Sequence, residues 1–289
     1  MSTDAPGDRM KAYERQETLA QFLPMLPIYA RIDGRSFSRF TKGFERPFDA
    51  RFRAAMLDTT RWLVAETHAR VGYTQSDEIS LCWEAERYDT PVFFNGRKQK
   101  MTSQLSALAT QRFNRFLWTS DDSFLRESAE RAPTFDARVF QLPNRAECAN
   151  AFLWREMDAT KNALSMAARE YYPHRELHGK NRSELNELLF QRGINFNNYP
   201  AAFKRGVYVQ RRMVRRLLSP DQVGRIPEER RPADGWVDRR EVVALDLPPL
   251  GRIANRVEVL FDAADHVALA LQPDEASIKP PGAKKPRSP

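Results

Sequence analysis

The sequence PIYARID, residues 27–33, decides the fold, because its apolar and polar side chains alternate and predict a strand with two distinct faces. A second alternating stretch, RVGYTQSDEISLCW at residues 70–83, predicts two short strands. A polar turn at Gln75-Ser76-Asp77 joins these two strands. The two stretches therefore supply three strands of one sheet.

Helical patterns separate these strands. Asp49 can cap a helix over about 50–69, and a second amphipathic helix covers 98–118. The segment ARVFQLP at 137–143 predicts another strand. The order is then β-α-β-β-α-β, the split βαβ arrangement, and the fold class is α+β with an antiparallel sheet and helices on one face. Further elements are predicted toward the C-terminus: a helix over about 146–170 and a late strand at 206–214.

The charge balance favours an anionic partner. Lys and Arg number 46 against 38 Asp and Glu, which leaves a net charge of +8. An excess of this size is typical of proteins that bind nucleic acid or nucleotides, ahead of a membrane surface. A charge that serves only solubility explains the number equally well.

Several classes of protein are excluded by composition. Two cysteines, Cys82 and Cys148, cannot form a disulfide framework or a cysteine-rich zinc site, and they are expected to be inert core residues. The four histidines include one HxxxH pair, His174 and His178, and no HxH spacing, and a histidine metal site is not expected. No run approaches about 18 apolar residues, and acids occupy the N-terminus where a signal peptide needs apolar residues. A soluble cytoplasmic protein is expected.

Carboxylates stand at the ends of neighbouring predicted strands. Asp33 ends the first strand and is followed by Gly34, while Asp77 and Glu78 lie at the hairpin turn. Two facing carboxylates repel each other unless a cation lies between them, and Mg²⁺ suits carboxylates that work on phosphate-rich ligands. Two such ions can clamp an in-line nucleotidyl transfer. On spacing alone, a turn and a surface acid explain the same residues.

Arg97, Lys98 and Lys100 gather at the predicted start of the second helix. Cations there oppose the helix dipole, so a bound anion would compensate both. A solvated basic patch is the alternative.

The stretches RIDGRSFSRFTKGF (31–44) and TQSDEISL (74–81) resemble the tRNA-His guanylyltransferase family, including its bacterial and archaeal guanylyltransferase-like branch. The resemblance covers roughly residues 9–215 and continues through an ordered series of further motifs: Arg97-x-x-Lys100, Phe135-Asp136-x-Arg138, Trp154-Arg155 before Asp158, Asn-Glu-Leu-Leu-Phe at 186–190, Ile194-Asn195-Phe196-Asn197 and Lys204-Arg205-Gly206. Their co-occurrence in this order is far more specific than any single motif.

The resemblance implies a palm-like catalytic domain, similar to that of DNA polymerases, which adds nucleotides in the 3′→5′ direction. Asp33 and Asp77 would bind two Mg²⁺ ions together with the carbonyl of Gly34, and Glu78 would support this metal site. The residues implied to bind the nucleotide are Arg35, Ser36, Phe37, Ser38, Arg46, Ser76, Arg97 and Lys100. Those implied, more weakly, to bind tRNA are Asn162, Lys204, Arg205 and Arg211.

The implied substrates are ATP, GTP and a 5′-monophosphorylated tRNA. ATP would activate the RNA end by adenylylation, and the 3′-hydroxyl of GTP would then attack it and expel AMP. The family also implies a homotetramer.

Three departures separate this chain from the eukaryotic members. Arg46 stands where those members have a lysine, and Thr160-Lys161-Asn162-Ala163 stands where they have His-Ile-Asn-Asn. Leu185 stands where they have a second lysine, whose role Lys180 could take over. The chain therefore looks more like the bacterial branch, which implies template-dependent repair of tRNA 5′ ends in place of, or beside, addition of one guanylate to tRNA-His.

The expected division of the chain has three parts. Residues 1–135 would form the palm-like domain, and 136–272 would complete the sheet and contribute to tRNA binding. Residues 273–289, rich in Pro and Lys, would be a disordered basic tail.

Two other functions remain open. A palm-domain nucleotide cyclase, or another enzyme that uses a nucleoside triphosphate, would suit the same sheet and carboxylates. A non-catalytic RNA-binding module would use exposed aromatics on its central strands. Asp33 and Asp77 stand at those strand ends instead, and they would repel a phosphate chain unless metal were bound. Within 193–212, aromatic and basic residues alternate, but core packing explains Phe196 and Tyr208 better than RNA contact does.

Overall fold

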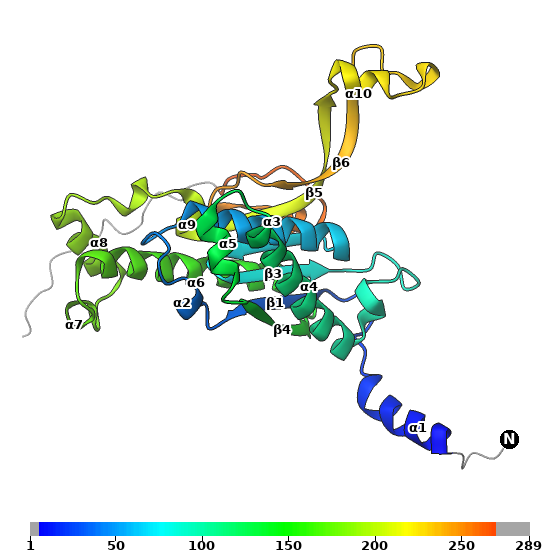
Figure 1. Ribbon diagram of the computed structural model, residues 1–289, viewed down its shortest axis with the longest axis horizontal. Coiled ribbons are helices and arrows are strands. Elements are labelled where there is room, and N and C mark those ends of the chain that lie inside the picture. Colours follow the sequence, from blue (N-terminus) through cyan, green and yellow to red (C-terminus); the bar gives the residue numbers. More distant parts are fainter. Residues whose placement is uncertain (1–5, 270–289) are drawn as a thin grey trace, which may run out of the picture.

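An antiparallel sheet forms the centre of the protein (Figure 1). The computed structural model describes residues 6–269. In this part of the chain the sheet has six strands, in the order β4-β1-β3-β2-β5-β6. The strands are β1 (Ile28–Arg35), β2 (Val71–Gln75), β3 (Glu78–Trp83), β4 (Thr134–Gln141), β5 (Val207–Leu217) and β6 (Trp236–Ala244).

One face of the sheet is covered by α3 (Ala50–Thr67) and α4 (Lys98–Trp118). The apolar side of β1, with Ile28 and Ile32, packs in one buried cluster with the inner stripes of both helices. This confirms the predicted β-α-β-β-α-β unit and the α+β fold class. The apolar stripe of each helix faces the apolar side of the sheet, because both surfaces are removed from water only when they pack against each other.

The opposite face is covered by the C-terminal part of the chain. Tyr29 and Tyr73 share a buried cluster with Phe152 of α6 (Arg145–Tyr171) and with α11 (Arg256–Phe261). The expectation of helices on one face thus describes α3 and α4 only. Because β1, β2 and β3 carry apolar residues on both faces, the second face also needs a cover.

The remaining elements are short or lie at the periphery. The hairpin of β5 and β6 and the helix α1 extend away from the body of the protein (Figure 1). The other helices are α1 (Pro6–Thr18), α2 (Phe37–Phe40), α5 (Ser123–Ala129), α7 (His174–Leu177), α8 (Arg182–Gln191), α9 (Ala201–Arg205) and α10 (Pro220–Gly224). Single 3₁₀ turns occur at Phe93–Gly96, Phe196–Asn198, Glu228–Arg230 and Leu250–Arg252.

The expected division of the chain stays a prediction. The boundary after residue 135 falls within β4, which pairs with β1 along its length. The basic tail at 273–289 lies outside the described residues. Between residues 6 and 269, no helix is both long and apolar enough to cross a membrane.

The start of α3 depends on Asp49, the residue predicted to cap it. Its carboxylate accepts hydrogen bonds from the backbone amides of Arg51 (2.8 Å), Phe52 (3.2 Å) and Glu45 (2.9 Å) and pairs with the Arg51 guanidinium (2.7 Å). Burial by itself would raise the pKa of Asp49, but these hydrogen bonds outweigh it and lower the pKa below its usual value. Asp49 thus joins the loop before α3 to the helix itself.

We expect Asp49→Ala to lower the free energy of unfolding by about 1–2 kcal/mol at pH 7, the loss typical of an N-cap. Because the pKa of Asp49 is lowered in the folded state, this stabilisation is present above about pH 4 and disappears as the pH falls through the folded-state pKa. Denaturant unfolding of both proteins at pH 7 and at low pH measures the difference. Equal stability at pH 7 would show that the cap contributes nothing.

Candidate active site

The end of β1 and the β2–β3 turn meet at one edge of the sheet. Asp33 lies opposite Glu78 in the strand register, and the backbone amide of Gly34 donates to the carbonyl of Asp77 at 3.0 Å. Ser76 adopts a left-handed conformation (φ 51°), which closes a two-residue turn and places Asp77 beside β1. The structure therefore brings Asp33, Gly34 and Asp77 together, as their order in the sequence predicts.

Gly34 allows the chain to turn sharply after Asp33. A Cβ atom at this position would lie 2.4 Å from the Phe37 ring, which is buried beneath the turn among other aromatic rings. Any larger residue would therefore displace either Phe37 or the strand end. Phe37 supports the backbone around the site, although the resemblance assigns its segment to nucleotide binding.

The two carboxylates form an electrostatically unfavourable pair without a cation. Burial raises the pKa of Asp77, and the neighbouring charge of Asp33 raises it further. Hydrogen bonds from Ser76 and from the Asp77 backbone lower this pKa and offset part of the rise. Within residues 6–269, no group of three or more His, Cys, Asp or Glu side chains is arranged to hold a metal ion. Two carboxylates and a nearby carbonyl are the partial oxygen set with which Mg²⁺ is usually held, since substrate phosphates and water complete its shell.

Glu78 faces Asp33 but is held by α6. Its two carboxylate oxygens accept from Nε and Nη2 of Arg155 at 2.6 and 2.7 Å, and Arg31 lies 3.8 Å away. Burial raises the pKa of Glu78, and the charges of Arg155 and Arg31 counter that effect in part. Glu78 thus ties the hairpin to α6, a connection that the sequence analysis did not find.

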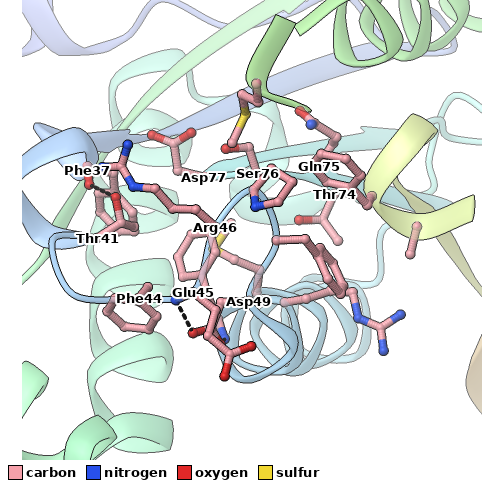
Figure 2. Close-up of a pocket in the computed structure, with 18 of the residues that line it drawn as sticks. Phe37, Thr41, Phe44, Glu45, Arg46, Asp49, Thr74, Gln75, Ser76 and Asp77 are labelled. Atoms are coloured by element: carbon pink, nitrogen blue, oxygen red, sulfur yellow. Dashed lines mark hydrogen bonds between the residues drawn. The ribbon is translucent and has the colours of Figure 1, made fainter. Parts of the chain in front are cut away.

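A cavity of about 440 Å³ opens beside Asp77 (Figure 2). Three separate parts of the chain line it: the segment from Phe37 into the start of α3, the turn residues 74–77, and the ends of α6 and α9. Its apolar walls are Phe44, Phe48, Phe52, Met56, Met166 and Phe203. Its cations are Arg46, Arg53 and Arg169. Its carboxylates are Glu45, Asp49, Asp77 and Glu170, so the cavity combines apolar side chains with charges of both signs.

Several predicted nucleotide-binding residues lie at this cavity. Phe37, Ser38, Arg46 and Ser76 line it, and Figure 2 shows Arg46 reaching across it toward the side where Asp77 lies. Arg35 ends β1 next to them, and Ser36 follows with a left-handed backbone (φ 56°). In the part of the chain that the structure describes, neither Arg46 nor Arg169 has a hydrogen-bond or ion-pair partner. Such cations are available to an anionic ligand.

Arg97 and Lys100 are not part of this arrangement. They lie at the start of α4, where the preceding Phe93 stacks on Trp83 at 6.0 Å. Trp83 pairs with Ile28, at the opposite end of β1 from Asp33. Figure 1 shows the same separation, with α2 at one end of the sheet and the start of α4 at the other. Within one chain, these two cations do not reach the cavity, because α4 runs the length of the sheet.

The residues implied to bind tRNA are spread over a wider area. Asn162 lies on α6 and donates to Asp158 at 3.3 Å, while Lys204 and Arg205 end α9 beside the cavity. Arg211 lies farther along β5 and donates to the carbonyl of Ala65 near the end of α3. The aromatic residues Phe196 and Tyr208 are buried, as core packing predicts, and so are the two cysteines.

Sequence reasoning missed the residues that close the cavity from α6 and α9. Met166, Arg169 and Phe203 come from segments far along the chain from the β2–β3 hairpin. Arg169 and Met166 fall on the exposed side of a helix whose other side is core, so no periodicity marks them. The only available signal was Phe203, an aromatic next to the Lys204-Arg205 pair.

An antiparallel palm-like sheet, two carboxylates at one edge and an arginine-containing cavity beside them are features of palm-type enzymes that act on nucleoside triphosphates. A family model described as tRNA(His) guanylyltransferase matches residues 7–143. The tRNA(His) guanylyltransferase of Schizosaccharomyces pombe is 31% identical over 216 residues, which cover 68% of this chain and 77% of that protein. The chain belongs to the tRNA(His) guanylyltransferase family.

Solved structures agree with this membership. A bacterial tRNA(His) guanylyltransferase-like protein in complex with ATP matches with a TM-score of 0.72 and 27% identity, over 89% of this chain and 99% of that one. A bacterial protein of the same description in complex with GTP matches with a TM-score of 0.67 and 27% identity, over 86% of this chain and 94% of the other. These likenesses confirm the palm-like fold.

Proposed function

We propose that this protein adds nucleotides in the 3′→5′ direction to the 5′ ends of tRNA, using ATP to activate the end and GTP as the added nucleotide. The observation that carries the proposal is the Gly34–Asp77 hydrogen bond, which brings Asp33 and Asp77 to one edge of the sheet, beside a cavity lined by Asp77 and three arginines. Similar structures with bound ATP and GTP support a nucleotide in that cavity.

Asp33, Asp77 and the carbonyl of Gly34 would hold two Mg²⁺ ions. Their fit rests on the geometry of the sheet edge, where the Gly34–Asp77 hydrogen bond brings two carboxylates and a carbonyl together, and on the charge of Asp33, which adds to burial in raising the pKa of Asp77. Bound Mg²⁺ would neutralise charge on the reacting phosphates and on the leaving group.

The cavity would orient the nucleotide. Arg46 and Ser76 are placed to contact its phosphates, and a guanidinium fork suits phosphate oxygens. The flat side chains of Phe48, Phe52 and Phe203 would enclose the base, because any base presents an apolar face for stacking. Holding both reactants in one geometry supplies much of the rate enhancement in phosphoryl transfer.

Two displacements at phosphorus would follow each other. In the first, an oxygen of the tRNA 5′-monophosphate attacks the α-phosphorus of ATP, and pyrophosphate leaves. In the second, the 3′-hydroxyl of GTP loses its proton and attacks the activated 5′-phosphate, and AMP leaves. Both are in-line transfers, so the same pair of carboxylates can serve each of them.

Incorporation of labelled GTP into a 5′-monophosphorylated tRNA tests this function. The protein should form a product one nucleotide longer when ATP, GTP and Mg²⁺ are all present, and none when EDTA is added or ATP is omitted. Binding of tRNA without incorporation would favour the RNA-binding module. Release of a cyclic nucleotide from GTP alone would favour the cyclase.

We expect tRNAs that lack their first 5′ nucleotide to be the better substrates. Thr160, Lys161 and Ala163 stand where eukaryotic members carry His, Ile and Asn, so the tRNA-His-specific role of that stretch is not expected here. Base pairing with the opposite strand would then select the nucleotide. Initial rates on a truncated tRNA of another specificity and on full-length tRNA-His, which needs an unpaired G, measure the preference. A faster reaction with full-length tRNA-His would contradict template-dependent repair.

We also propose that the protein acts in the cytoplasm as a homotetramer, as the family resemblance implies. Light scattering of the purified full chain measures the mass of the assembly. A mass equal to that of one chain would contradict the tetramer.

A further inference from the structure

Trp154 is an exposed aromatic side chain close to the candidate active site. Phe152 and Glu156 are buried and face the sheet, whereas 52% of Trp154 is exposed. An exposed indole ring leaves a large apolar area in contact with water. Its position close to a site proposed to act on RNA makes it a candidate contact for a nucleobase.

The position of Trp154 relative to the sheet follows from its neighbours. The Glu156 carboxylate accepts from the amide of Leu250, on the side of α6 near β5. Arg155 points to the other side and holds Glu78 of β3, and Asp158, four residues after Trp154, also binds Arg155. Residues four apart share one helix face. Phe152 and Glu156 are each two residues, roughly 200° of helix, from Trp154. Trp154 therefore lies on the solvent side of α6, adjoining the flank from which Arg155 reaches β3.

A short series of side-chain contacts connects the indole ring to the residue opposite Asp33. The Arg155 guanidinium lies 4.6 Å from the centre of the Trp154 ring, and its nitrogens bind both oxygens of Glu78. Glu78 is directly opposite Asp33. Two side chains thus separate Trp154 from the candidate metal ligand. Because the guanidinium occupies one face of the ring, the other remains available for a flat partner.

The neighbouring edge strand adds positive charge on the same side of the sheet. Asp136 of β4 lies opposite Asp33, and two residues farther along Arg138 lies opposite Arg31. Arg138 is exposed and has no hydrogen-bond or ion-pair partner within residues 6–269. Phe140 follows, half exposed, with its ring 5.3 Å from that of Tyr29. A free cation thus lies two residues from the strand position opposite Asp33, and the Phe140 ring lies beside Tyr29, toward the other end of β1.

We infer that Trp154 is the stacking platform for the 5′-terminal base of the RNA, with Arg138 placed to contact the adjoining backbone phosphate. Proteins hold single-stranded RNA ends by stacking bases on aromatic side chains, and such stacking accepts any base. This tolerance suits an enzyme that must hold RNA ends of varied sequence. The inference rests on the proposed function, since it assumes that a 5′ end reaches Asp33 and Asp77.

Binding of two matched RNAs tests the inference. Both are hairpins with one unpaired, 5′-monophosphorylated nucleotide, but in the second RNA that nucleotide is abasic. Fluorescence anisotropy gives the Kd of each for the wild-type protein, Trp154→Ala and Trp154→Phe. The control is Trp118→Ala, because Trp118 is also exposed (48%) but ends α4.

We expect the wild-type protein and Trp118→Ala to bind the RNA with the base about tenfold more tightly than the abasic RNA, in line with the strength of base stacking on aromatics. Trp154→Ala should bind both RNAs equally, and Trp154→Phe should keep part of the difference. Retention of the full difference by Trp154→Ala, or its absence in the wild type, would overturn the inference. A change in oligomer mass without any change in this ratio would do so too, and would assign Trp154 to contacts between copies.

The two proposals fail in different ways. GTP incorporation by the same wild-type preparation is measured in parallel on a 5′-monophosphorylated tRNA whose missing first nucleotide is a guanylate. Incorporation together with an unchanged Kd ratio in Trp154→Ala overturns the stacking platform alone. A lost Kd ratio without incorporation by the wild type supports the platform as an RNA contact and overturns the proposed enzymatic function.

Discussion

Asp33→Asn and Asp77→Asn are each expected to abolish nucleotide transfer while leaving the protein folded. The two carboxylates meet at the Gly34–Asp77 hydrogen bond, whereas Asp49, which also lines the cavity, is already held by backbone amides and by Arg51. Loss of a metal ligand removes several kcal/mol of transition-state stabilisation, which corresponds to a rate about 10³-fold lower. Asn has nearly the same shape as Asp, so packing is unchanged.

The stability of Asp77→Asn provides an independent check. Burial and the charge of Asp33 raise the pKa of Asp77, so at neutral pH its ionised form makes folding less favourable. A neutral amide removes this unfavourable contribution, and the melting temperature should therefore stay the same or rise. A lower melting temperature would mean that Asp77 serves mainly as a structural turn residue.

Single-turnover rates at saturating Mg²⁺, with thermal unfolding in parallel, measure these effects. Asp89→Asn is a matched control, because Asp89 is exposed and pairs with Arg87 in the loop after β3, away from the cavity. It should behave as the wild type does. Near-normal turnover by either Asp33→Asn or Asp77→Asn would refute their assignment as the metal ligands.

Arg155→Ala is expected to lower both stability and transfer. Its guanidinium is 12% exposed and binds both oxygens of Glu78, which is 13% exposed, so the substitution leaves a largely buried carboxylate without its partner. Breaking a buried pair in this way costs about 3 kcal/mol. Transfer by the remaining folded protein should fall about 10–100-fold, because the hairpin that carries Asp77 loses its connection to α6.

Arg145→Ala is the matched control for this prediction. Arg145 also starts from α6 and binds both oxygens of a buried glutamate, Glu84, but at the far end of β3. We expect a similar loss of stability from Arg145→Ala with little change in the transfer rate of the folded protein. Equal loss of transfer in both variants would show that α6 affects the site only through global stability.

The double variant Glu78→Gln/Arg155→Met separates two roles for Glu78. If Glu78 acts only by tying the hairpin to α6, replacing both charged groups should restore much of the stability lost in Arg155→Ala. The transfer rate should recover with it. Restored stability without transfer would instead support the role near the metal that the family resemblance implies.

The sequence by itself determined the β-α-β-β-α-β core and the meeting of Asp33 with Asp77. Both depend on short-range rules: alternation sets the buried face of a strand, and a two-residue turn sets the register of a hairpin. Once β1 is placed beside that hairpin, the end of one strand and the turn of the other lie side by side. The strand expected at 137–143 proved to be Thr134–Gln141, a shift of the kind expected where patterning is weak at strand ends.

Only the tertiary structure decided which distant segments complete the site. Arg155 meets Glu78, and Arg169 and Phe203 close the cavity, through the packing of α6 and α9 against the sheet. It also placed Arg97 and Lys100 at the far end of the sheet, although the family resemblance implies that they bind the nucleotide. The physical reason is that periodicity records which side of an element is buried, whereas the direction and position of that element depend on the shape of the whole core.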